Sequence, residues 1–353
     1  MAKHSQSAGS QLDYPETVSG RWLVKAMVGT LVVAGVALYL TVCLLFYQGQ
    51  WQFTFSPPRF AAQRQALSAS FLAGSWARRT GPVAYPAPIS AAEAASKSGL
   101  QIVDHHFNYT EQGVARLDGW WIPAADADHT PANYAAPKDA TSKDATSKDA
   151  TQMVVLFCPD GQSNLPANLT AFRAFHALGV SLFAFDYRGF GSSQAGHPSQ
   201  DKSYQDGTAA LHYLTETRHI DPSRILVYGA EIGAAVAAQV AYGAPRIAGL
   251  VLENPQPSLA KQVRRQQHIH LLPMWLVFTN RFDISQIVPL LKMPKLIFAT
   301  PAEPEYEPGA TAIYDAAVPP KQFVKANATA LYSAPAWQQA MQSFVNSPTT
   351  QSH

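Results

Sequence analysis

The chain has 353 residues, of which 47% are hydrophobic, and a formal net charge of +2. A hydrophobic content of this size allows one large core, or a core and a membrane segment, and it excludes a disordered chain. The charge is near zero and no Lys/Arg run is interleaved with aromatic residues, which excludes nucleic-acid binding. The two cysteines, Cys43 and Cys158, lie in separate apolar runs, so neither a disulfide framework nor a metal cluster is predicted.

The first structured element is a membrane helix. Residues 26–47 carry no charge, and about 20 apolar residues are enough to cross the hydrocarbon core of a bilayer. A cleaved signal peptide is disfavoured because the apolar stretch is too long and no small-x-small site follows it. We therefore expect an uncleaved single-pass anchor at 21–50, after a disordered, polar N-terminus at 1–20. Interfacial aromatic residues are expected at Trp22, Tyr47 and Trp51.

The next segments are low in apolar periodicity. Residues 51–98 are rich in Ala, Pro and Ser and are predicted to form a linker that carries one short helix. Within the following domain, 99–346, the repeat KDATS predicts a solvated, low-complexity insertion at 124–151, because it has nothing apolar to bury. A short tail, 347–353, ends the chain.

The domain itself alternates strand and helix patterns, which indicates a three-layer α/β architecture with a mostly parallel sheet and an antiparallel start. Strands are predicted at 101–110, 114–123, 153–158, 181–186, 224–229, 248–253, 294–299 and 321–326. Amphipathic helices are predicted near 165–178, 204–219, 232–243, 308–316 and 336–346.

Four segments resemble the α/β-hydrolase superfamily, in particular its N-terminally anchored branch of lysophospholipase-like and monoacylglycerol-lipase-like serine hydrolases. They are LDGWWIP at 117–123, DYRGFGSS at 186–193, DPSRILVYGAEIGAAVAAQVA at 221–241 and RFDISQIVPLLKMPKLIFAT at 281–300. The resemblance implies the three-layer α/β-hydrolase fold for the domain. It also implies a nucleophile, an acid and a histidine at set places in the chain.

Two of those three places hold residues that a serine hydrolase does not use. The nucleophile turn G-x-S-x-G reads Gly229-Ala230-Glu231-Ile232-Gly233, so Glu231 stands at the nucleophile position. The histidine position falls on Ala328, and no histidine occurs between His270 and His353. The acid position holds Glu303, an accepted variant, although a surface carboxylate in a Pro-rich loop is the competing interpretation.

The oxyanion hole is altered as well. The resemblance places its backbone donors at Gly161, Gln162 and Ile232. The loop reads Cys158-Pro159-Asp160-Gly161-Gln162, in which Pro159 lacks an N–H and Asp160 adds negative charge near the expected oxyanion. We hypothesise that the Glu231 carboxylate itself fills this hole at the N-terminus of the following helix.

The resulting expectation is a membrane-anchored pseudo-hydrolase that binds a protein partner or an apolar ligand, with no cofactor. The alternative is an active ester, lipid or peptide hydrolase, with Glu231 as a carboxylate nucleophile or with a displaced base such as His176 or His212. His268 and His270 lie where a cap is expected, and no third ligand accompanies them, so no metal is predicted. Basic residues flank the anchor on both sides, and anchored relatives favour a periplasmic or extracytoplasmic domain.

Overall fold

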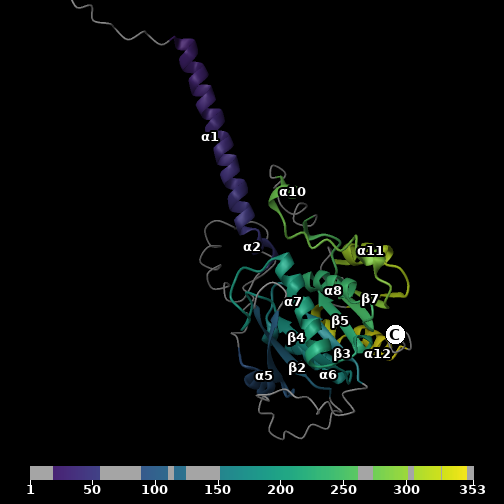
Figure 1. Cartoon of the computed structure of the whole chain (residues 1–353). Coiled ribbons are helices and arrows are strands. Elements are labelled where there is room, and N and C mark those ends of the chain that lie inside the picture. Colours follow the sequence, from purple (N-terminus) through teal and green to yellow (C-terminus); the bar gives the residue numbers. More distant parts are fainter. Residues whose placement is uncertain are drawn as a thin grey trace, which may run out of the picture. The chain divides into compact units, whose positions relative to one another are not determined.

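The computed structural model describes residues 19–55, 89–109, 115–124, 152–260, 273–300, 306–326 and 328–347 (Figure 1). The chain forms two compact units, 1–48 and 49–353. The predicted disordered N-terminus, the KDATS insertion and most of the 56–98 part of the predicted linker lie outside the described residues.

The first unit contains α1 (Gly20–Gly49), a single helix of 30 residues. Apolar side chains are exposed along its length, and Cys43 is its buried residue. Among the described residues, α1 is the one helix whose length and composition would allow it to cross a membrane, and a signal sequence near an N-terminus would have the same properties. The predicted apolar helix is therefore confirmed.

The second unit is built on an eight-stranded sheet with the order β1-β2-β4-β3-β5-β6-β7-β8. Strands β1 and β2 pair antiparallel, as do β2 and β4, and the remaining pairs are parallel. The mostly parallel sheet with an antiparallel start is thus confirmed. The strands are β1 (Val103–Tyr109), β2 (Ala115–Ile122), β3 (Val154–Cys158), β4 (Ser181–Asp186), β5 (Ile225–Ala230), β6 (Gly249–Glu253), β7 (Lys295–Ala299) and β8 (Lys321–Lys325).

Helices cover both faces of the sheet, and each face has its own hydrophobic cluster (Figure 1). One cluster contains buried residues of α7 (Gln200–His212), α8 (Ile232–Gly243) and α11 (Tyr306–Ala316). The other contains buried residues of α5 (Ala91–Ser98), α6 (Leu169–Ala177) and α12 (Pro335–Val345). The structure therefore has the three layers that the alternating pattern predicts, and α5 is the short helix expected within 51–98.

Shorter elements complete the described fold. Two four-residue helices are α2 (Trp51–Thr54) and α10 (Met274–Val277). A π turn, Tyr213–Thr217, extends α7. Single 3-10 turns occur at Leu165–Asn168, Pro222–Arg224, Val288–Leu290 and Ala328–Ser333.

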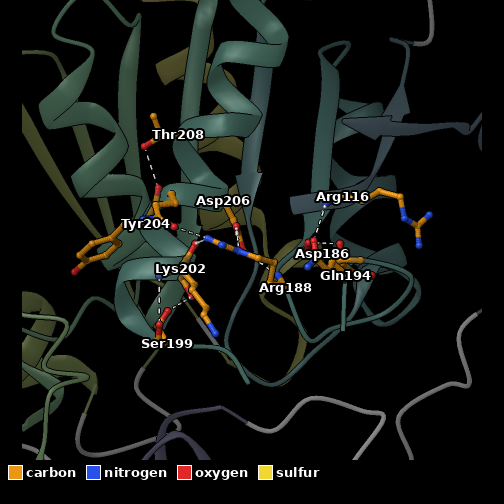
Figure 2. A network of polar contacts seen from close by, with 12 residues as sticks. Arg116, Asp186, Arg188, Gln194, Ser199, Lys202, Tyr204, Asp206 and Thr208 are labelled. Carbon is orange, nitrogen blue, oxygen red and sulfur yellow. Dashed lines mark hydrogen bonds and ion pairs between the residues drawn. The ribbon is translucent and has the colours of Figure 1, made fainter. Parts of the chain in front are cut away.

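The loop after β4 is held by a buried ion pair. Arg188 Nε lies 2.6 Å from Asp206 Oδ1, and the Arg188 backbone N–H donates to Asp206 Oδ2 at 2.9 Å. Figure 2 shows the guanidinium lying alongside α7, where it also donates to the Lys202 carbonyl. Burial raises the pKa of Asp206 to about 6, against the lowering effect of Arg188. The DYRGFGSS motif thus fixes a loop at the carboxyl edge of the sheet, where the candidate site lies.

The segment just after α1 packs into the second unit. Gln50 and Thr54 are buried, and Phe55 is fully buried against Phe190 and Phe282, with ring centroids 6.2 and 5.7 Å away. Trp51 stacks on His197 at 4.5 Å. Residues 50–55, expected at the end of the anchor and the start of a linker, are instead part of the domain core, because their aromatic side chains bury apolar surface there.

Candidate functional site

The candidate site begins at the tight turn between β5 and α8. Glu231 occupies this turn with φ 51° and ψ −110°, a left-handed conformation that a non-glycine residue rarely adopts. A Cβ on Gly229 would lie 2.2 Å from the Gly233 carbonyl oxygen, and one on Gly233 would lie 2.2 Å from the Cys158 carbonyl oxygen. Both glycines are therefore sterically required, and the nucleophile elbow keeps its shape around a glutamate.

The Glu231 side chain lies at the N-terminus of α8. It is half-buried and makes no capping hydrogen bond to the first turn of α8. The backbone of Glu231 is held instead, because its N–H donates to the Glu253 carbonyl at 2.9 Å and its carbonyl accepts from Ala234 at 3.1 Å. The Glu231 carboxylate therefore does not cap α8, and its expected place in the oxyanion hole stays a prediction.

A different carboxylate takes up the donors of the oxyanion loop. Asp160 Oδ1 accepts hydrogen bonds from the backbone N–H groups of Gln162 at 2.9 Å and Ser163 at 2.7 Å. The predicted oxyanion donor Gln162 is thus already bonded within its own loop. An Asp side chain commonly accepts a hydrogen bond from the backbone N–H two residues later, in an Asx turn, because both groups lie close together in the chain.

The predicted oxyanion position Gly161 lies close to the side chains of Ile232 and Phe55 and to the backbone of Thr54. A Cβ on Gly161 would lie 2.9 Å from the Ile232 side chain, 3.1 Å from the Phe55 ring and 3.2 Å from the Thr54 carbonyl. Gly161 and Ile232, both predicted for the hole, are therefore brought together by the fold. Thr54 and Phe55 also lie against Gly161, a contact that the sequence does not predict because the composition of residues 51–98 indicates a linker.

A buried carboxyl lies next to the elbow, at the end of β6. Glu253 Oε2 accepts hydrogen bonds from the hydroxyl groups of Tyr228 at 2.7 Å and Tyr332 at 2.9 Å. Burial raises the pKa of Glu253 to about 7, although the two tyrosine hydrogen bonds lower it, and the charge of Asp160 adds to the rise. The sequence analysis missed this carboxyl, since Glu253 appeared there only as the last residue of a strand.

Tyr332 belongs to the 3-10 turn Ala328–Ser333, which contains the predicted histidine position. Ala328 begins this turn, and Tyr332 ties it to Glu253. The turn that contains the predicted histidine position is thus anchored by a tyrosine and a glutamate.

The other predicted residues are spread over the molecule or lie outside the described part. Glu303, His268 and His270 are among the residues that the structure does not describe. His176 is half-buried in the last turn of α6, and His212 is exposed at the end of α7. These two helices pack on opposite faces of the sheet.

One group of side chains in the described part could hold a metal ion. Asp104 and His106 on β1 and Asp118 on β2 have ligand atoms within 4.8 Å of one another, and His106 Nδ1 lies 3.1 Å from Asp118 Oδ1. Burial, followed by the negative charge of Asp104, raises the pKa of Asp118 to about 7. Sequence reasoning missed the group because only the antiparallel register of β1 with β2 places Asp118 opposite His106.

Comparison with known proteins connects this geometry to hydrolases. Residues 150–311 match the family Hydrolase_4, described as serine aminopeptidase, S33. The chain is 28% identical over 228 residues to an uncharacterized protein of Mycobacterium tuberculosis. The aligned region covers 64% of this chain and 69% of that protein. It is also 36% identical over 107 residues to the Alpha/beta hydrolase domain-containing protein WAV2 of Arabidopsis thaliana, and this alignment covers 30% of this chain and 34% of that protein.

Solved structures share the fold at low sequence identity. An esterase of Pyrococcus furiosus superposes with a TM-score of 0.53 and 18% identity, over 71% of this chain and 94% of the esterase. A 2,6-dihydroxy-pseudo-oxynicotine hydrolase superposes with a TM-score of 0.53 and 12% identity, over 72% of this chain and 70% of the hydrolase. At such identities the likeness shows the α/β-hydrolase fold.

Proposed function

We propose that this chain, which matches a hydrolase family over residues 150–311 and has the α/β-hydrolase fold, is a membrane-anchored protein without hydrolytic turnover that uses the fold to bind a protein partner or an apolar ligand. The observation that carries the proposal is the hydrogen bond from the Gln162 N–H to the Asp160 carboxylate. A hydrolase of this fold needs that donor for the developing oxyanion, since removal of one oxyanion donor costs roughly 10²–10³-fold in kcat.

The negative charge of Asp160 also disfavours hydrolysis. A tetrahedral intermediate carries a negative oxygen, and a carboxylate bonded into the oxyanion loop would repel it where a hydrolase offers only N–H dipoles. Thr54 and Phe55 also pack closely against Gly161 in this loop. Both features support a fold kept for binding.

Proton transfer gives independent support. Hydrolysis at a carboxylate or hydroxyl nucleophile needs a base to activate water or the nucleophile, and this fold supplies it as a histidine after the last strand. The sequence has no histidine from 271 to 352. Without that histidine, an ester formed on the Glu231 carboxylate would not be hydrolysed by the route that this fold usually provides.

The anchor belongs to the same proposal. The apolar helix α1 would hold the second unit at a membrane as a single-pass, uncleaved anchor, with the domain on the extracytoplasmic side. A domain kept at a membrane gains effective concentration towards membrane-bound partners, which suits a binding role better than it suits release of a soluble product.

The test uses the purified full chain in detergent. Short-chain acyl esters and a fluorophosphonate probe are offered to the parent, to Glu231→Ser, and to the double variant Glu231→Ser with Ala328→His. We expect no turnover and no labelling in the parent or the single variant. Esterase activity in the parent that disappears on Glu231→Ala would refute the proposal and support the alternative of a carboxylate-based hydrolase.

A further inference from the structure

The short helix α10 presents two large apolar side chains to solvent. Trp275 is 75% exposed and Leu276 is 59% exposed, whereas the next two residues, Val277 and Phe278, are buried. The helix is held in place on its inner side, and Arg281 donates a hydrogen bond to the Trp275 carbonyl at 2.7 Å. Trp275 and Leu276 are thus two adjacent, exposed apolar side chains on a fixed support.

The residues that follow α10 form hydrogen bonds to the residue after the end of α1. Gln50 Oε1 accepts hydrogen bonds from the Thr279 N–H at 2.6 Å, the Thr279 hydroxyl at 3.2 Å and the Asn280 N–H at 3.3 Å. Gln50 itself is only 6% exposed. Residues 279–280 are thus bonded to the residue that directly follows Gly49, the last residue of α1.

Chain lengths limit how far α10 can lie from the apolar segment, whatever the arrangement of the two units. Gln50 follows Tyr47, the last residue of the apolar stretch 26–47, by three residues, which is about 4.5 Å of helical rise. Trp275 precedes Thr279 by four residues, which span at most about 14 Å of extended chain. A membrane that contains α1 would therefore have its headgroup layer within reach of α10.

We propose that Trp275 and Leu276 insert into the interfacial layer of the bilayer that holds α1, so that the domain has a second, peripheral contact with lipid. The inference rests on the anchor in the proposed function. Trp is enriched at the level of the lipid headgroups because its ring is apolar and its N–H remains solvated, and Leu supplies apolar area. This second contact would restrict the orientation of the domain over the membrane.

The test places a polarity-sensitive label on the full chain in phosphatidylcholine vesicles. Leu276→Cys carries the label in a Cys43→Ala background, since Cys158 is fully buried. Leu290→Cys is the matched control, because Leu290 is 58% exposed and lies in the turn that leads into β7, at the amino edge of the parallel strands. We expect a blue-shifted emission that nitroxide lipids quench at position 276, and a solvent-like emission without quenching at position 290.

Two outcomes would overturn the inference, and they differ in what else they overturn. If alkaline carbonate extracts the chain from the vesicles, the anchor fails and the contact of α10 fails with it. In the other outcome, the chain resists extraction while the label at position 276 shows the same solvent-like emission and the same lack of quenching as the label at position 290. In that case the anchor stands and only the contact of α10 is refuted.

Discussion

Asp160 Oδ1 accepts a hydrogen bond from the backbone N–H of Gln162 at 2.9 Å, so the loop after β3 satisfies its own donor with a neighbouring carboxylate. In a serine hydrolase of this fold the N–H of that loop would remain available to the substrate. In the proposed function, this loop therefore adds to the effect of Glu231 at the nucleophile position and Ala328 at the histidine position.

This relationship predicts the effect of Asp160 substitutions in the double variant Glu231→Ser with Ala328→His. Asp160→Ala should free the Gln162 N–H and increase labelling by a fluorophosphonate probe about tenfold or more, since oxyanion donors are worth roughly 10²–10³ in rate. Asp160→Asn is the control, because its amide oxygen can keep the hydrogen bond. Equal labelling of the Ala and Asn variants would show that the hydrogen bond does not limit the site.

The strained backbone at Glu231 predicts a stabilising substitution. A non-glycine residue held at positive φ costs of the order of 1–3 kcal/mol, so Glu231→Gly should stabilise the domain by about 1 kcal/mol. Glu231→Ala removes the carboxylate and keeps the strain, and it should give no such gain. Thermal unfolding of the full chain in detergent measures both. A gain that is the same in the two variants would assign the cost to the carboxylate instead.

The glycines that flank Glu231 predict a severe steric defect. Gly229→Ala would place a Cβ 2.2 Å from the Gly233 carbonyl oxygen, and overpacking against backbone should destabilise the domain by at least about 2 kcal/mol. Gly243→Ala, at the end of α8, meets nothing within 4 Å and should leave the midpoint of thermal unfolding unchanged or raise it. Similar midpoints for the two variants would contradict the observed close contact.

The buried carboxyl of Glu253 predicts a pH dependence of stability. Its pKa is raised from 4.5 to about 7 in the folded protein, so the folded state holds an extra proton between these values. The free energy of unfolding should therefore fall as the pH rises from about 4.5 to about 7, and then level off with respect to this group. Glu253→Gln keeps an acceptor for both tyrosines and should become progressively more stable than the parent over that range.

Urea midpoints measured at several pH values check this expectation. Glu93→Gln provides the matched control, because Glu93 is half-exposed and pairs with Lys97 on the surface of α5. Its difference from the parent should be small and nearly independent of pH, as is usual for surface ion pairs. Parallel curves for the parent and Glu253→Gln would show that Glu253 stays ionised throughout.

Much of the fold could be predicted from local sequence patterns. Apolar runs such as SLFAFD give β4 with the predicted bounds, Ser181–Asp186, because a strand buried on both faces needs a continuous apolar run. The elbow glycines predict the turn around Glu231, since a tight strand-to-helix connection excludes a Cβ on either side. Side chains paired across strands, such as His106 with Asp118, were beyond such patterns because the register is set by tertiary packing.

The sequence by itself determined the α/β architecture, the apolar N-terminal helix, the glutamate at the elbow and the absence of a histidine between His270 and His353, because each depends on local composition, periodicity or chain order. Only the tertiary structure decided that Asp160 bonds the loop donors, that Phe55 covers Gly161 and that Glu253 is buried between two tyrosines. These contacts join residues whose burial and hydrogen bonding arise when distant segments pack together, and no local pattern encodes them.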